Sequence, residues 1–233
     1  MKNISLQSQK IKSFVLRQGR LTKGQQHAID TLLPKYAIDY HHYHLSNTII
    51  DFTKYFDNNN PIIVEIGFGM ADTSISIAQN NPQYNYIGIE VHSPGIGTLL
   101  MQLAKHDIKN LKIIWYDAVA TLEHIIGNNN IHGFHIFFPD PWTKRRHHKR
   151  RLINEAFVQL LIAKLTINGY ISIATDDDDY AAAIKEILIN NNHLRIENNT
   201  LDLACNINKP LTKFEKRGLQ LNHQIYNFYA IKL

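Results

Sequence analysis

The sequence predicts an α/β fold in which a mostly parallel sheet carries helices on both faces. From Pro61 onward, short β-rich segments alternate with amphipathic segments, which is the pattern of parallel strands joined by crossover helices. The chain has 233 residues, of which 44% are hydrophobic. That size and composition fit one globular domain with a short appendage and a full hydrophobic core.

Five segments are predicted as strands of the parallel part of the sheet, namely 62–66, 86–90, 111–116, 133–138 and 170–174. A sixth segment, 224–231, follows a loop and is expected to add an antiparallel edge strand. Helices are predicted near 72–80, 95–106, 119–126, 152–166 and 179–190. The helical spacing of apolar residues is clearest in 152–166.

Residues 1–60 are expected to form a basic N-terminal arm followed by one or two helices that pack on the main domain, which spans 61–233. Thr22 and Gln25 have the spacing of a helix capping box, and apolar residues follow them at helical intervals. We therefore expect one globular domain overall, with its first helix beginning close to Thr22.

The composition excludes several classes of protein. Cys205 is the only cysteine, so no disulfide can form within the chain, and no metal site is predicted. The first residues lack the apolar stretch of a secretory signal, and no segment has the roughly 18 apolar residues of a membrane span. The sequence thus predicts a cytoplasmic protein with no membrane partner.

Positive charge is concentrated in one segment. Residues 144–151 contain six Lys or Arg and two His, within a chain whose formal net charge is +5. A local concentration of this kind predicts a surface for an acidic partner such as a nucleic acid.

A glycine-rich turn follows the first predicted strand. Gly67 and Gly69 allow the backbone to turn sharply and to approach a ligand before the next helix. A dinucleotide fingerprint would carry a third glycine where this chain has Asp72, and Glu65 would repel a pyrophosphate. The turn is better suited to a ligand with a sulfonium and an amino-acid group, although a tight turn with an incidental Glu65 is the alternative.

Two more acids end the next two predicted strands. Glu90 lies twenty-three positions after Gly67, the spacing at which an acid accepts the ribose hydroxyls of an adenine nucleoside. Asp117, followed by Ala118, ends the third strand and can meet the adenine amino group. Capping of the following helix is an equally good interpretation of Asp117. The carboxyl ends of these strands form the ligand crevice of an open α/β sheet.

Asp140 ends the fourth strand between Pro139 and Pro141, which restrict the local backbone. Enzymes that methylate exocyclic amines typically have a second adjacent proline and an aromatic residue here, whereas Trp142 follows Pro141 directly. This difference weighs against that chemistry. A purely structural role for the stiff segment is the alternative.

Taken together, the segments 65–69, 139–151 and 212–215 resemble the bacterial tRNA (guanine-N7)-methyltransferase family, and the similarity covers about residues 13–233. The resemblance implies a Rossmann-like class I methyltransferase fold, S-adenosylmethionine as cofactor and S-adenosylhomocysteine as product. It implies transfer of a methyl group to N7 of a guanine in tRNA, with guanine-46 of the variable loop as the expected position. No obligate protein partner is expected.

The resemblance also assigns roles to individual residues. The expected cofactor contacts are Glu65, Gly67, Gly69, Glu90, Asp117, Ala118 and Asp140, of which Asp140 is also the expected catalytic residue. The expected contacts to the target nucleotide are Lys144, Asp176, Thr212, Lys213, Phe214 and Glu215. The expected RNA-binding residues are Arg146, His147, His148, Lys149, Arg150 and Arg151.

The chain departs from the family pattern at Ala71, commonly Gly, at Asp177, commonly Trp, and at Lys209, often Arg. Ala71 is expected to be tolerated if its φ is negative. Most of the acids in 176–179 are expected to cap the following helix, with only Asp176 reserved for the substrate.

Other functions consistent with these residues are methylation of a different RNA or of a small molecule, and RNA binding without catalysis. An NAD-dependent oxidoreductase is disfavoured by Glu65 and Asp72. The three acids at successive strand ends favour a working cofactor site over a fold retained only for RNA binding.

Overall fold

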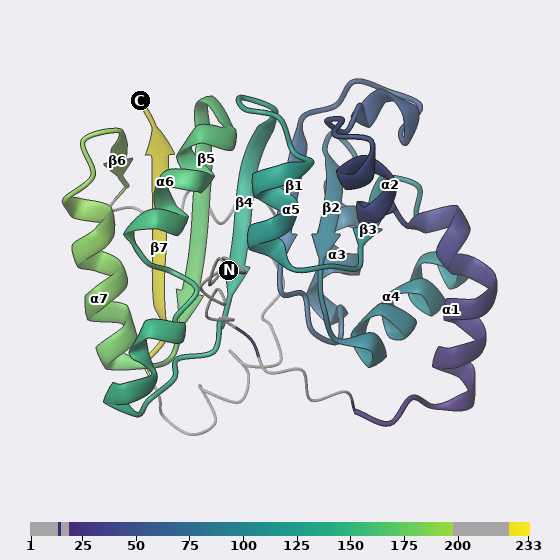
Figure 1. Cartoon of the computed structure of the whole chain (residues 1–233), viewed down its shortest axis with the longest axis horizontal. Coiled ribbons are helices and arrows are strands. Elements are labelled where there is room, and N and C mark those ends of the chain that lie inside the picture. The colour runs from purple at the N-terminus through teal and green to yellow at the C-terminus, as the bar shows by residue number, and fades with distance from the viewer. Residues whose placement is uncertain (1–13, 15–18, 198–223) are drawn as a thin grey trace, which may run out of the picture.

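A computed structural model of the chain describes residue 14 and residues 19–197 and 224–233, which form a sheet with helices on both of its sides (Figure 1). The described strands are β1 (Ile62–Ile66), β2 (Asn85–Ile89), β3 (Leu111–Ile114), β4 (Ile131–Phe137), β5 (Leu165–Thr175), β6 (Leu194–Ile196) and β7 (Tyr226–Lys232). They form one sheet in the order β3-β2-β1-β4-β5-β7-β6. Strands β1 to β5 pair in parallel, and β7 pairs with both β5 and β6 in antiparallel fashion.

The predicted mostly parallel sheet with an antiparallel strand near its edge is confirmed. β3 ends two residues before the predicted limit, and β5 begins five residues earlier than predicted. The short strand β6 was not predicted. It borders β7 at the end of the sheet, so β7 is the last strand but one rather than the edge itself.

Seven α-helices lie within the described residues: α1 (Lys23–Tyr36), α2 (Tyr40–Leu45), α3 (Asp72–Asn80), α4 (Ser93–Lys105), α5 (Ala118–His124), α6 (Glu155–Lys164) and α7 (Asp178–Ile189). Two 3-10 helices, η1 (Phe52–Lys54) and η2 (Arg145–Arg150), lie in loops. The predicted helix 152–166 was too long at both ends. Asn154 caps α6 by accepting a hydrogen bond from the Phe157 N–H at 3.1 Å, and the chain passes directly from Lys164 into β5.

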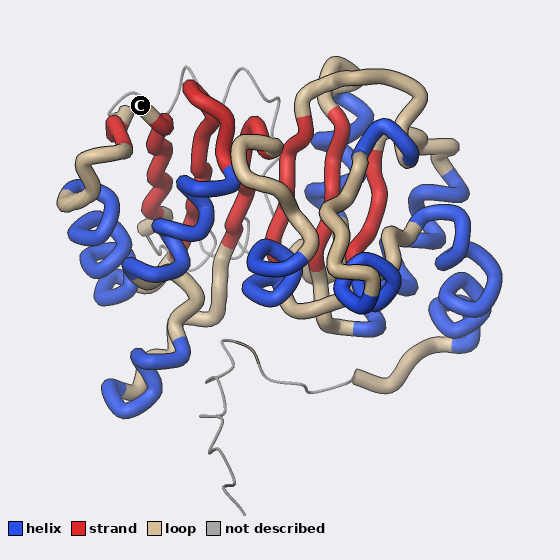
Figure 2. The backbone as a smooth tube through the Cα atoms, turned by 45° about the horizontal axis from the view of Figure 1, so that its top comes forward, coloured by secondary structure: helices blue, strands red, loops and turns tan. Residues whose placement is uncertain are grey.

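Two hydrophobic clusters occupy the two faces of the sheet. One unites the sheet with apolar residues of α1, α3 and α4, and the other with those of α2, α5, α6 and α7. Figure 2 shows the strands as one layer with helices on both of its sides. Because side chains alternate along each strand, Ile63 faces the first cluster and Val64 the second. Both residues are fully buried.

The N-terminal helices pack on the main part of the fold. Thr22 and Gln25 form the predicted capping box, and the Gln25 side-chain amide donates to the Pro94 carbonyl at 3.2 Å and to Thr98 at 3.0 Å on α4. After α1, Ala37 forms a β-bridge with Ile113 on β3. The segment between α1 and α2 therefore extends the sheet beyond β3.

Candidate active site

The carboxyl ends of the parallel strands enclose a cavity of about 200 Å³. Gly67 contributes to it after β1, Glu90 after β2, Asp117 and Ala118 after β3, and Asp140 after β4. β1 and β4 are neighbours at the place where the strand order reverses, which is where open α/β sheets bind ligands. The sheet thus brings together the residues that the sequence placed at separate strand ends.

Backbone conformation, rather than crowding, accounts for the glycines of the turn. Gly67 and Gly69 have φ of 76° and 55°, and a Cβ added at either would meet no described atom within 4 Å. Gly67 lines the cavity, whereas Gly69 and the buried Glu65 on β1 are not among its lining residues. Ala71 also has a positive φ, 65°, so the condition under which we expected it to be unstrained is not met.

Glu90 ties the glycine turn to the loop after β2. Its Oε2 accepts a hydrogen bond from the Gly69 N–H at 2.9 Å, while Oε1 accepts from the N–H groups of Val91 at 2.7 Å and His92 at 2.9 Å. A carboxylate has about four acceptor positions. With these three hydrogen bonds it has one acceptor position left, on Oε2.

Asp117 caps the following helix and also lies in the cavity wall. One of its carboxylate oxygens accepts from the Ala120 N–H of α5 at 2.8 Å. The preceding Tyr116 forms part of the same wall, where it stacks on Tyr40 of α2 with ring centroids 3.6 Å apart. Tyr40 shares a hydrogen bond of 3.0 Å with His124 Nδ1.

This aromatic support was not predicted from the sequence, because Tyr40 and Tyr116 are far apart in the chain. His41, His42 and His44 on the same short helix are exposed, and the His44 ring also stacks against Tyr40. Within the described part of the chain, no three His, Cys, Asp or Glu side chains are grouped so that they could hold a metal ion.

Asp140 lies at the rim of the cavity in a segment of unusual backbone. Phe138 and Trp142, on either side of the Pro139–Pro141 segment, have φ of 53° and 49°. Strained residues of this kind persist only where the surrounding structure holds them. Desolvation by the surrounding protein raises the pKa of the Asp140 carboxyl above its usual value, although the residue itself is exposed to solvent.

The basic segment folds into η2 directly after Asp140, at the end of the sheet where the parallel strands terminate (Figure 1). Lys144, Arg146 and Lys149 are exposed, whereas His147, His148 and Arg150 are partly buried. The Arg150 guanidinium lies over the Trp142 ring, 4.9 Å from its centroid. Desolvation and the neighbouring cations lower the pKa of His147, which disfavours its charged form.

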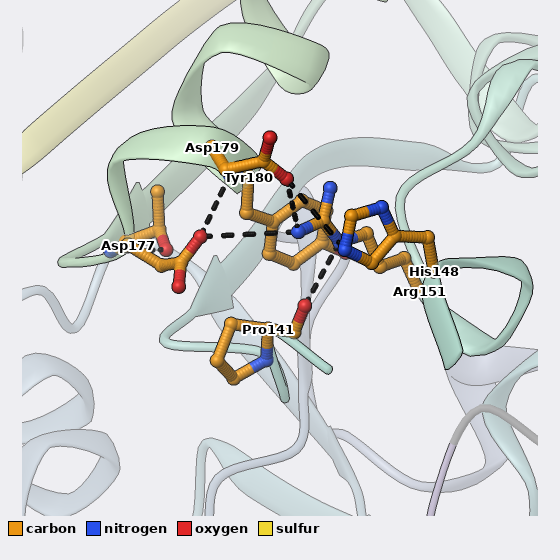
Figure 3. A network of polar contacts seen from close by, with 7 residues as sticks. Pro141, His148, Arg151, Asp177, Asp179 and Tyr180 are labelled. Carbon is orange, nitrogen blue, oxygen red and sulfur yellow. Dashed lines mark hydrogen bonds and ion pairs between the residues drawn. The ribbon is translucent and has the colours of Figure 1, made fainter. Parts of the chain in front are cut away.

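Arg151 differs from the rest of the basic segment. It is only 7% exposed, and its Nη2 donates to Asp179 Oδ2 at 2.6 Å. Its Nε donates to the Pro141 carbonyl at 2.8 Å, and its guanidinium lies 4.7 Å from the centroid of the Tyr180 ring (Figure 3). The side chain expected to bind RNA therefore points into the protein.

The acids after β5 have separate partners. Asp177 caps α7 by accepting from the Tyr180 N–H at 2.8 Å, as expected for most of this run, and Asp178 accepts from the Tyr226 hydroxyl at 3.0 Å. Asp176 is half-buried beside them. The expected substrate residues Thr212, Lys213, Phe214 and Glu215, together with Lys209, lie outside the described residues.

The sheet order and the strand-end cavity are those of a Rossmann-like methyltransferase fold. Structural comparison agrees: the 16S rRNA methyltransferase KamB superposes with a TM-score of 0.52 at 10% identity, covering 79% of this chain and 94% of that chain. A protein of Streptococcus mutans in complex with S-adenosylhomocysteine gives a TM-score of 0.51 at 11% identity, covering 92% of this chain and 100% of that chain. These two similarities concern the fold alone.

Sequence comparison identifies the family. A family model described as "Putative methyltransferase" matches residues 59–228. The tRNA (guanine-N(7)-)-methyltransferase of Nitrosospira multiformis is 46% identical over 218 residues, 93% of this chain and 92% of the relative. That of Francisella philomiragia is 43% identical over 225 residues, 96% of this chain and 95% of the relative. The chain belongs to the tRNA (guanine-N7)-methyltransferase family, and the resemblance inferred from its motifs is confirmed.

Proposed function

We propose that the protein transfers a methyl group from S-adenosylmethionine to N7 of a guanine in tRNA, at guanine-46 of the variable loop. The observation that supports this most directly is the position of Asp140. Its side chain lines the cavity, and the loop that carries it leads into the cationic η2. A nucleotide held through its backbone by η2 would bring its base to Asp140. The names of the related proteins support guanine N7 as the acceptor.

The residues around the cavity fit S-adenosylmethionine. Glu90 offers an acceptor for a ribose hydroxyl, Asp117 with Ala118 offers a polar edge for adenine, and Tyr116 adds an aromatic wall. Gly67 leaves open space beside its backbone for the amino-acid end of the cofactor. When bound, S-adenosylmethionine supplies an electrophilic methyl group on a sulfonium.

Guanine N7 has a lone pair and no proton, so this chain does not need a general base to create the nucleophile. The task that remains for the protein is alignment, which can lower the barrier substantially. The purine ring gains positive charge during the transfer, and the Asp140 carboxylate can stabilise that charge or accept hydrogen bonds from the N1–H and N2–H₂ edge. We assign Asp176 and Lys144 to the same nucleotide, together with 212–215.

The exposed cations of η2 are assigned to the tRNA backbone. Contacts with phosphates set the orientation of the RNA and carry little sequence information, so selection of the target depends mainly on tRNA shape and an unstacked loop base. We propose a cytoplasmic location and no obligate protein partner. Among the described residues, no helix is both long and apolar enough to cross a bilayer.

The test is to incubate purified protein with labelled S-adenosylmethionine and a tRNA transcript, and to map the methylated nucleoside. The matched control is the same transcript with adenine at position 46. We expect 7-methylguanosine at position 46 and no label on the control. Label at another guanine, label on the control transcript, or no label on either transcript would contradict the proposal.

A further inference from the structure

Arg151 connects two loops that both contribute to the proposed active site. Pro141, whose carbonyl it holds, directly follows Asp140 in the loop after β4. Asp179, whose carboxylate it holds, lies in the first turn of α7, three residues after Asp176. The two loops follow neighbouring strands, which are joined at their ends by the Phe138 N–H and the Ala174 carbonyl at 2.8 Å.

The guanidinium is held from several directions (Figure 3). Below it is the ring of Tyr180, which is fully buried and whose hydroxyl accepts from the Ile153 N–H at 2.8 Å. The Asp177 carboxylate lies 3.9 Å from the Arg151 Nη2. His148 Nε2 lies 3.8 Å from the Asp179 carboxylate that Arg151 also binds. A charge-assisted bond of 2.6 Å to Asp179 is among the strong types of hydrogen bond, and it lowers the pKa of that carboxyl.

This environment does not suit a phosphate ligand. To reach RNA, the guanidinium would have to leave Asp179, the Pro141 carbonyl and the Tyr180 ring, and the two acids would then face the RNA uncompensated. Lys149 shows the contrast, since it lies in the same segment but is exposed. Phosphate contacts are expected from side chains of that second kind.

We propose that Arg151 is a positioning residue, which ties the Asp140 loop to the start of α7 and thereby sets the placement of Asp140 relative to Asp176. Its effect on methyl transfer rests on the proposed function. Its structural role, the link from Arg151 to Pro141 and Asp179 that we call the clamp, does not. The planar fork of arginine can donate to a carbonyl and a carboxylate at once. A lysine would keep the charge but satisfy these partners poorly.

The decisive variant is Arg151→Lys. It is compared with Lys149→Ala in the same segment and with Lys185→Ala, an exposed cation further along α7. The measurements are the single-turnover rate at saturating cofactor and tRNA, and the slope of log K against log salt for tRNA binding. We expect Arg151→Lys to slow transfer by about tenfold or more with an unchanged slope. Lys149→Ala should flatten the slope, and Lys185→Ala should change neither quantity.

A second variant, Asp179→Asn, changes an exposed side chain and therefore keeps the test available if Arg151 variants do not fold. The clamp predicts slower transfer with unchanged tRNA affinity. If Arg151 instead binds phosphate, releasing it from Asp179 would tighten tRNA binding. Wild-type transfer rates in both Arg151→Lys and Asp179→Asn, or restored RNA binding by lysine after loss in Arg151→Ala, would overturn the proposal.

Amide hydrogen exchange provides a measurement that does not depend on activity. Exchange across 138–151 and 175–179 should accelerate in Arg151→Lys but not in Lys149→Ala. If wild-type protein fails to methylate tRNA, the proposed function fails while this measurement still tests the clamp. Unchanged exchange in Arg151→Lys would contradict the clamp even in an active enzyme.

Discussion

The two sides of the active site are built in different ways. On the cofactor side, at the ends of β1 to β3, carboxylates bind backbone N–H groups: Glu90 accepts three of them, and Asp117 caps α5. On the proposed substrate side, after β4 and β5, the Arg151 side chain joins two loops through the Pro141 carbonyl in one and the Asp179 carboxylate in the other. The carboxylates on the cofactor side are positioned by the backbone of neighbouring strands, helices and turns. The loops on the substrate side are held together by a single guanidinium group.

This difference has a functional consequence. Glu90 is held mainly by N–H groups of its own loop, and Asp117 by one of the helix that it caps. Local backbone geometry therefore fixes both carboxylates, so the cofactor pocket can be formed without the RNA. The substrate loops contain strained residues at Phe138 and Trp142, which depend on long-range contacts for their conformation. Substitutions on the first side should therefore affect cofactor affinity, and substitutions on the second side should affect the rate of transfer.

The largest expected effect is that of Asp140→Ala. Loss of the carboxylate at the reacting base should slow single-turnover methyl transfer by about a hundredfold, with little change in tRNA affinity because η2 is intact. Asp140→Asn retains the shape and one acceptor. If the rate falls much less in Asp140→Asn than in Asp140→Ala, Asp140 acts mainly by positioning the base. If it falls equally in both, Asp140 acts through its negative charge. Wild-type kinetics in Asp140→Ala would remove this residue from the catalytic centre.

Glu90→Ala tests the cofactor side. Removal of a charged acceptor from three N–H groups and one ribose hydroxyl should weaken S-adenosylmethionine binding by about 10- to 100-fold, since each such bond contributes roughly 1.5–3 kcal/mol. Isothermal titration calorimetry measures this, with Glu186→Ala on the exposed face of α7 as a control for loss of a carboxylate. Unchanged affinity, or tighter binding of NAD by the wild type, would refute the assignment.

The pH dependence of the chemical step should reflect Asp140. Its pKa is raised by desolvation, so as pH falls the carboxylate is protonated earlier than an ordinary Asp, whose pKa is about 4. The single-turnover rate should be level at neutral pH and then fall by about tenfold per unit below the raised pKa. The Asp140→Asn variant is the control, because it should lack this decline. A wild-type rate that keeps falling between pH 8 and 7 would instead indicate a histidine.

Lys149→Ala and Arg150→Ala test the cations of η2, of which Lys149 is exposed and Arg150 is partly buried. Each phosphate contact removed should reduce the slope of log K against log salt by roughly 0.7–0.9, without changing cofactor affinity. Fluorescence binding titrations at several salt concentrations give the slope. If both variants keep the wild-type slope, η2 is a solvated surface rather than an RNA-binding one.

The smallest effect is expected for Ala71→Gly. Glycine should relieve the cost of the left-handed conformation, about 1 kcal/mol, but loses a buried methyl group and gains chain entropy when unfolded. We expect the free energy of unfolding to stay level or to rise by up to about 1 kcal/mol in urea titrations. Ala182→Gly, at an exposed position within α7, should instead destabilise the protein by about 1 kcal/mol.

Much of the cofactor side could be predicted from the sequence for a topological reason. Parallel strands end at the same edge, so Glu90, Asp117 and Asp140 had to meet once the strands were located. The hydrogen bonds of Glu90 and Asp117 are mostly local as well, since Glu90 accepts from Val91 and His92 and Asp117 accepts from Ala120. Short-range patterns in the sequence contain this information.

The substrate side shows what such patterns miss. Arg151 lies at the end of a run of cations, and nothing in its immediate neighbours distinguishes it from Arg150. Its partners Pro141 and Asp179 are 10 and 28 positions away. The positive φ of Ala71 and the stack of Tyr40 on Tyr116 are likewise set by tertiary packing, and the three residues of β6 are too few to produce a recognisable pattern.

The bridge between Ala37 and Ile113 has a consequence for the behaviour of the protein at high concentration. An uncovered border strand offers free N–H and C=O groups to a strand of another molecule, which is a common beginning of aggregation. Here the Ile38 N–H donates to the Ile113 carbonyl at 2.7 Å, so the segment after α1 shields β3. At the opposite border, β6 offers only three residues. Removal of residues 1–38 should therefore expose β3 and make the protein prone to aggregate, whatever its effect on catalysis.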